Sequence, residues 1–209
     1  MKKYALFILV GFFVVALMTA QAQTTGEKFR LDLTAGPALP TGDFADGYGI
    51  GFHVGATFNL PLKGGFVIFG EGRYQSFALD ISEWGSYPGN VTSSGGTYGA
   101  FSLVAGGKYF FPMQSKIKIY GLAGLGLFMQ SVGDLTVHYT ISTAWYTASV
   151  TETWSFDSQT DIGVLFGLGM NYPMSPKLSL VGELRLVVIF TEGDSTMFIP
   201  LLVGVVIHL

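Results

Sequence analysis

Three short turns of closely similar composition divide the sequence into segments of nearly equal length. They read LPLKGG at 60–65, FPMQSK at 111–116 and YPMSPK at 172–177. In each turn a proline ends the preceding segment and a lysine follows closely, a combination that favours a tight connection between strands. Apolar or alternating segments of about ten residues flank each turn. This spacing is typical of strands that cross a membrane as a barrel.

Longer polar connections alternate with these short turns and contain most of the acidic residues outside the strands. They cover residues 38–49, 79–97, 132–159 and 191–196. Barrels of the outer membrane have short turns on the periplasmic side and long loops outside. Counting around the turns and loops predicts an all-β chain whose eight antiparallel strands form a transmembrane β-barrel. The predicted strands are 28–37, 50–60, 66–78, 98–111, 117–130, 161–172, 178–190 and 198–209.

Apolar and polar residues alternate within the predicted strands. Phe52, Val54 and Phe58 share one face of the second strand, while His53 and Thr57 share the other. A soluble barrel would place apolar side chains inside and charges outside. The apolar faces here nearly lack charge, which predicts that they contact lipid.

Composition supports a membrane barrel and excludes other classes. Charged residues make up 12% of the chain and hydrophobic residues 49%, whereas soluble domains have about 25% charged residues. After the amino-terminal segment no apolar run approaches the roughly 20 residues of a membrane helix. The chain has no cysteine for a disulfide scaffold, and its 14 acidic against 11 basic residues disfavour a nucleic-acid partner.

Aromatic residues gather near both predicted membrane boundaries, as interfacial belts require. The alternative is the ordinary preference of aromatic residues for strands. The group near the short turns is Phe58, Phe66, Tyr109, Phe111 and Tyr172, and the group near the long loops is Tyr48, Tyr74, Tyr98, Phe190 and Phe198.

The amino terminus has the pattern of a secretory signal peptide. Lys2 and Lys3 precede the apolar stretch 4–18, and Ala20-Gln21-Ala22 provides a cleavage site. The alternative, a retained membrane anchor, is disfavoured because stop-transfer charges are missing. We therefore predict a signal peptide at 1–22 and a barrel domain at 23–209.

Three segments resemble a known family. They are GPALPTGDF at 36–44, YGLAGLG at 120–126 and the alternating last strand. The chain resembles the outer membrane β-barrel domain family, which includes the OmpA transmembrane domain and the OmpX and OmpW groups. The resemblance implies a Gram-negative outer membrane, contact with lipopolysaccharide and phospholipid, and assembly by periplasmic chaperones and the outer-membrane machinery. We expect a monomer. Such barrels usually end in an aromatic residue, whereas this chain ends in Leu209.

The sequence contains no arrangement that points to catalysis, a cofactor or a metal. Small outer-membrane enzymes such as lipid A deacylases resemble one another in combining a His with a Ser and an acid. His53, His138 and His208 are dispersed and lack that arrangement, and no cysteine is present. We therefore predict a non-enzymatic protein.

The third long connection, 132–159, is rich in aromatic residues, Thr and Ser. Its alternation predicts that two barrel strands continue outside the membrane as a two-stranded flap. Trp145, Tyr146 and Trp154 could form a surface for a host structure, a glycan or a protein. Alternatively, they pack on each other or lie at the lipid headgroups.

Two charged pairs lie near the middle of predicted strands. They are Glu71 with Arg73 and Glu183 with Arg185. Facing lipid would cost about 2–4 kcal/mol for each Arg, so both pairs point into the lumen. The third and seventh of eight strands lie opposite each other, which predicts contacts of Glu71 with Arg185 and of Arg73 with Glu183. The alternative is pairing between adjacent strands.

Other charged residues share the inward phase. The predicted lumen charge network is Glu71, Arg73, Glu183, Arg185, Lys118 and Asp161, and Arg30, Asp32 and Lys108 also point inward. Such a balanced set favours a plug over an ion-selective ring. We therefore predict a structural or surface-interacting barrel with a closed lumen. The alternative is a narrow porin-like channel, or the conduit for small hydrophobic molecules that the OmpW resemblance implies.

Overall fold

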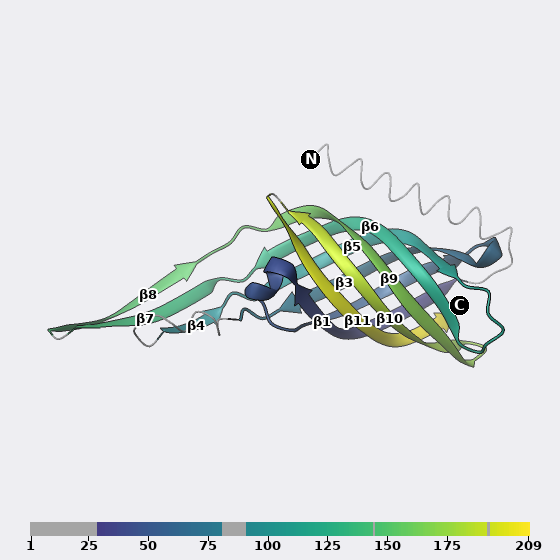
Figure 1. Cartoon of the computed structure of the whole chain (residues 1–209), viewed down its shortest axis with the longest axis horizontal. Coiled ribbons are helices and arrows are strands. Elements are labelled where there is room, and N and C mark those ends of the chain that lie inside the picture. Colours follow the sequence, from purple (N-terminus) through teal and green to yellow (C-terminus); the bar gives the residue numbers. More distant parts are fainter. Residues whose placement is uncertain (1–28, 81–90, 144, 192) are drawn as a thin grey trace.

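A computed structural model describes residues 29–80, 91–143, 145–191 and 193–209 (Figure 1). The predicted signal peptide, 1–22, lies outside the described residues. In the described part of the chain, no helix has both the length and the apolar character needed to cross a membrane.

Eight antiparallel strands form a closed barrel in the order β1-β11-β10-β9-β6-β5-β3-β2. This confirms the predicted fold class and strand count. The strands are β1 (Arg30–Thr41), β2 (Gly51–Pro61), β3 (Phe66–Phe77), β5 (Tyr98–Phe110), β6 (Lys118–Val132), β9 (Gln159–Ser175), β10 (Leu178–Thr191) and β11 (Asp194–His208). Two short 3-10 helices, η1 (Gly42–Asp46) and η2 (Lys63–Gly65), lie between strands.

One predicted loop is shorter in the structure than in the prediction. The connection expected at 191–196 is a tight reversal, because Thr191 of β10 pairs directly with Asp194 of β11. Gly193 has a φ of 86°, a conformation that glycine adopts without steric cost and that tight strand reversals require. The strands therefore continue further on this side than the polar composition indicated.

A second, three-stranded sheet lies beyond one end of the barrel (Figure 1). It contains β4 (Val91–Gly95), β7 (Leu135–Thr143) and β8 (Tyr146–Trp154), with β7 in the centre. The prediction of a two-stranded flap is therefore incomplete, because the connection at 79–97 adds β4. An isolated hairpin is marginally stable in water, and a third strand adds a ladder of hydrogen bonds. We call β4, β7 and β8 the outer sheet.

Alternation sends the two faces of each barrel strand to different surroundings. Six large apolar residues on the outer face are between 49% and 64% exposed, namely Phe52, Val54, Phe58, Leu103, Leu168 and Val203. The inner face buries polar, charged and aromatic side chains. This is the inversion that separates a membrane barrel from a soluble one.

Glycines on the inner face make room for large side chains. A Cβ on Gly169 of β9 would lie 2.3 Å from the Tyr120 ring of β6. A Cβ on Gly106 would lie 2.6 Å from the ring of Phe69 in the same way. Gly167 is similarly close to the Arg185 side chain, since its Cβ would lie 2.9 Å from Arg185 Cγ. The glycine-rich strands therefore allow a lumen filled by side chains.

Candidate functional site

Six charged side chains meet inside the barrel and form what we call the lumen network. Three are acidic and three are basic, and each residue is at most 5% exposed. They come from β1, β3, β5 and β10 because alternation points these positions inward. The members are Asp32, Glu71, Arg73, Lys108, Glu183 and Arg185.

Glu71 joins opposite walls of the barrel. Arg185 Nη1 donates to both of its carboxylate oxygens, at 2.7 and 2.8 Å. Arg73 Nη2 donates to Glu71 Oε2 at 3.2 Å, and the Thr57 hydroxyl donates to the same oxygen at 3.0 Å. The predicted contact between Glu71 and Arg185 is thus present in the structure, together with a contact inside β3 itself.

Glu183 is the second centre of the lumen network. Arg185 Nε donates to Glu183 Oε2 at 2.7 Å, and Lys108 Nζ lies 3.2 Å from Oε1. The Tyr120 hydroxyl also donates to Oε1. Lys108 further pairs with Asp32 at 2.9 Å and lies over the Tyr120 ring. Each carboxylate therefore has a cation within ion-pair distance.

The predicted contact of Arg73 with Glu183 is wrong. Arg73 Nη1 instead donates to Thr34 Oγ1 at 3.2 Å and lies 3.5 Å from His53 Nδ1. The Glu183 oxygens already accept from Arg185, Lys108 and Tyr120. Arg73 therefore stays with the acid of its own strand and with the neighbouring β1 and β2.

Two predicted members lie outside the lumen network. Lys118 is exposed near a short turn, where its Nζ donates to the Met113 carbonyl at 2.9 Å. Asp161 accepts from Gln130 Nε2 at 2.6 Å, nearer the long loops. Lys108 and Asp32, which share the inward phase, take their place. Lys118 and Asp161 belong to strand ends, where the lumen opens to water.

An aromatic layer lies at the end of the lumen nearer the outer sheet. Phe77 is the centre of this layer, with ring centroids 5.1 Å from Phe44, 5.9 Å from Tyr98 and 5.3 Å from Phe198. Tyr48 packs 4.7 Å from Phe44, and burial raises the pKa of its phenol. Edge-to-face contacts of this kind stabilise packed aromatic groups.

The aromatic layer corrects part of the predicted interfacial belt. Tyr98 and Phe198 are 5% and 0% exposed and point inward, whereas Tyr74 and Phe190 are exposed as predicted. The missed signal was strand phase, because Tyr98 lies on the same face of β5 as Lys108, and Phe198 lies on the same face of β11 as Leu202. The belt near the short turns remains on the outer surface, where Phe66 and Tyr109 are in contact.

Little space remains between the lumen network and the aromatic layer. A cavity of about 10 Å³ lies there, lined by side chains that include Glu71, Arg185, Phe128 and Phe198. This is about the minimum volume that holds one water molecule. Side chains therefore occupy most of the space between the two layers.

The outer sheet displays the predicted loop aromatics. Trp145 is 96% exposed, Tyr146 63% and Trp154 47%. Cross-strand contacts between hydroxyl-bearing side chains, such as Thr136 with Thr153 at 3.2 Å, hold β7 against β8. The aromatic side chains are therefore presented to the surroundings by an ordered sheet.

The histidines are separated in space as they are in sequence. His53 contacts Arg73 in the lumen, His138 contacts Thr151 in the outer sheet, and His208 contacts Ser179 at the opposite end. The described residues contain no group of His, Asp and Glu suited to a metal ion.

A closed antiparallel barrel with an apolar outer face and a charged lumen defines a small outer-membrane β-barrel. The model of the outer membrane protein beta-barrel domain matches residues 7–206, so the chain belongs to that family. It is accordingly a protein of the outer membrane. No curated protein sequence matches the chain significantly.

The chain is also similar to solved structures of outer-membrane proteins. Neisserial surface protein A (NspA) is 17% identical, with 87% of this chain and 97% of that chain covered and a TM-score of 0.55. Ail of Yersinia pestis is 15% identical, with 86% and 99% covered and a TM-score of 0.43. The barrel domain of Pseudomonas aeruginosa OprF is 14% identical, with 85% and 96% covered and a TM-score of 0.42. The likeness to NspA concerns the fold.

Proposed function

We propose that this barrel is non-enzymatic and that its lumen is closed. It serves as a structural protein of the outer membrane and contacts other molecules through its outer sheet. The observation that carries the proposal is that two layers of side chains, the lumen network and the aromatic layer, lie one after the other along the lumen. The lumen network spans the barrel from β3 to β10, and the aromatic layer follows it with a cavity of only about 10 Å³ between them.

The lumen network suits a plug better than a conduction path. Its three acids and three bases balance, whereas a selectivity ring carries charges of one sign. Moving one side chain aside would leave several buried charges without partners, which costs several kcal/mol. The competing function is a narrow channel or a conduit for small hydrophobic molecules.

Conductance in planar bilayers tests the closed lumen. The mature barrel, shown to be folded by heat-modifiable migration on a gel, should give no steady single-channel current. The protein is delivered to the bilayer from proteoliposomes, and protection from added protease shows that it is inserted in their membrane. Steady open currents from the wild-type protein would overturn the proposal and favour the channel.

The outer sheet is the proposed working surface. Its exposed Trp and Tyr side chains offer flat apolar area with polar edges, and Thr and Ser between them offer hydrogen bonds. This chemistry suits a glycan or protein surface outside the cell. The other proposed partners are outer-membrane lipids, periplasmic chaperones and the assembly machinery. The barrel itself is proposed to be a monomer.

Deletion of residues 135–156 tests the working surface, because it removes β7 and β8 and leaves the barrel strands intact. Expressing cells should lose adhesion to a glycan array or a protein-coated surface, while the barrel still shows heat-modifiable migration. Unchanged adhesion on every surface to which wild-type cells bind would contradict this role.

A further inference from the structure

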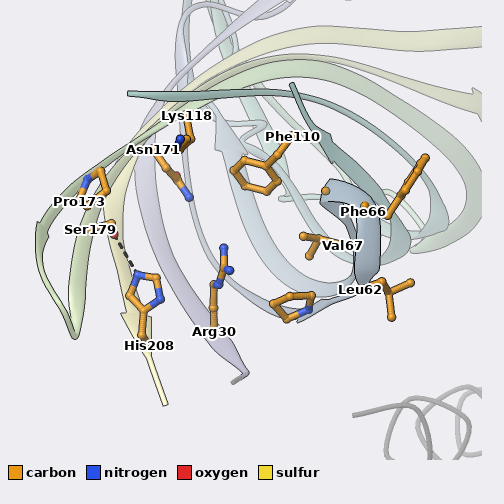
Figure 2. A pocket seen from close by; sticks show the side chains of 13 residues that line it. Arg30, Leu62, Phe66, Val67, Phe110, Lys118, Asn171, Pro173, Ser179 and His208 are labelled. Carbon is orange, nitrogen blue, oxygen red and sulfur yellow. Dashed lines mark hydrogen bonds between the residues drawn. The ribbon is translucent and has the colours of Figure 1, made fainter. Parts of the chain in front are cut away.

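The end of the barrel that carries the short turns contains an open pocket of about 250 Å³ (Figure 2). Strand ends of β1, β6, β9, β10 and β11 surround it, together with the turn between β2 and β3. Short turns face the periplasm in outer-membrane barrels. The pocket is therefore the periplasmic mouth of a lumen that the lumen network closes further in.

The lining of this pocket is cationic. Arg30 and Lys118 contribute two permanent positive charges, and the described residues of the lining include no Asp or Glu. The lysines of the three short turns add positive charge around the mouth, and the described residues at this end include no acidic side chain besides Asp32. Asp32 lies deeper and is paired with Lys108 at 2.9 Å. Such a field attracts anions from the periplasm.

Several hydrogen-bond donors in the pocket have capacity left for a ligand. Arg30 has no ion pair or hydrogen bond with the described side chains, and its guanidinium points into the pocket (Figure 2). Lys118 Nζ uses one contact, to the Met113 carbonyl, and can donate two more hydrogen bonds. Ser179 and His208 are hydrogen-bonded to each other at 2.9 Å on the pocket wall.

Asn171 provides an independent sign of a missing partner. The residue is only 9% exposed, lines the pocket, and has an Oδ1 atom without a hydrogen-bond partner among the described residues. A buried polar atom without a partner is costly. The amide nitrogen points into the pocket (Figure 2) and can donate there, while Oδ1 lacks a donor. A ligand that carries both acceptor oxygens and an O–H group would satisfy both atoms.

We propose that the periplasmic mouth binds a phosphate group. Two permanent cations match a phosphate dianion, and Arg30, Lys118, Asn171 and His208 approach from four different strands, which suits a group with several acceptor oxygens. The rim is partly apolar, with Leu62, Phe66 and Pro173 in the lining. The phosphate is either inorganic phosphate or the headgroup of a phospholipid from the inner leaflet.

Phosphorus NMR with inorganic phosphate tests the site on the mature barrel in a phosphate-free maltoside detergent. Saturable broadening is expected for the wild type. The Arg30→Gln/Lys118→Gln variant should bind at least tenfold more weakly. The control, Lys63→Gln/Lys177→Gln, removes the same charge from the same end but outside the pocket lining, and its affinity should stay within twofold of the wild type.

Asn171→Leu keeps the net charge and should weaken binding at least threefold, which a purely diffuse electrostatic attraction would not produce. Heat-modifiable migration shows that each variant is folded, and if the double variant fails to fold, Lys118→Gln and Asn171→Leu carry the test.

Dihexanoyl phosphatidic acid identifies the source of the phosphate group. Tighter binding than inorganic phosphate indicates a lipid headgroup, and weaker binding indicates free phosphate. Three results would each overturn the proposal: no saturable binding, equal losses in the control variant, or equally strong competition by acetate.

Discussion

The lumen and the outer sheet use the same antiparallel pairing but place their side chains in opposite surroundings. In the lumen, Glu71 is buried and contacts cations from its own strand and from the opposite wall. In the outer sheet, most described side chains of β8 are exposed, and Trp145 beside it is 96% exposed. Inward positions are therefore constrained by contacts with one another, while the outer sheet is constrained mainly by its backbone ladder.

Stability and recognition therefore depend on different regions of the protein. Buried charges depend on their partners, because an unpaired buried charge is strongly destabilising. Exposed side chains contribute little to folding and are available for contacts with other molecules. The same type of substitution should therefore have very different effects in the two regions.

Glu71→Ala should have the largest effect. It leaves Arg185 and Arg73 without their shared carboxylate, which should lower the free energy of unfolding by about 3–5 kcal/mol. Urea unfolding followed by circular dichroism measures the loss. Asp157→Ala, which removes an exposed acid near the outer end, is the charge-matched control and should be nearly neutral. Equal effects of both variants would show that the buried pairing does not stabilise the barrel.

Phe77→Ala tests the aromatic layer. Its ring is fully buried among Phe44, Tyr98 and Phe198, and its loss should cost about 3 kcal/mol by the same unfolding measurement. Phe77→Leu keeps most of the apolar volume and should cost less than half as much. A negligible loss in the alanine variant would mean that the layer is loosely packed.

Gly169→Ala tests the fit of Tyr120 in the lumen. The added Cβ would lie 2.3 Å from the ring and displace the hydroxyl that donates to Glu183, at a cost of about 1–3 kcal/mol. Gly182→Ala in β10 is the control, since its Cβ would meet its nearest atom at 3.7 Å. Unfolding midpoints in urea should separate the two variants, and identical midpoints would contradict this packing.

The Trp145→Ala/Trp154→Ala variant should have the smallest effect on stability, within about 0.5 kcal/mol of the wild type. Its adhesion to glycan or protein surfaces should nevertheless fall. A large loss of stability would show that these side chains support the fold of the outer sheet, and the proposed working surface would then be wrong.

Much of the barrel was predictable because alternation and turn spacing are local properties of the sequence. The eight strands and the inward phase of Glu71 and Arg185 follow from a period of two residues, and opposite strands can be counted. The partner of Arg73 was not predictable in this way. Strand tilt and stagger set the height of each side chain in a barrel, so equal positions along two strands do not lie at equal depth.

The other misses have similar causes. Strand β4 lies in a polar connection, and its pairing with β7 is a long-range contact that residue pattern alone does not indicate. The aromatic layer was partly mistaken for an interfacial belt, because Tyr98 and Phe198 lie near the expected boundary and only their phase shows that they point inward. Lys118 has the correct phase but lies beyond the network, at the strand end.

Thiol accessibility tests the closed lumen most directly, because the chain contains no cysteine. Gln75 is 1% exposed and lines the cavity between the lumen network and the aromatic layer, whereas Lys177 lies in an exposed turn. A charged methanethiosulfonate reagent should modify Gln75→Cys at least about 100-fold more slowly than Lys177→Cys, because access requires local opening of the lumen. Comparable rates for the two variants in folded barrels would contradict a closed lumen.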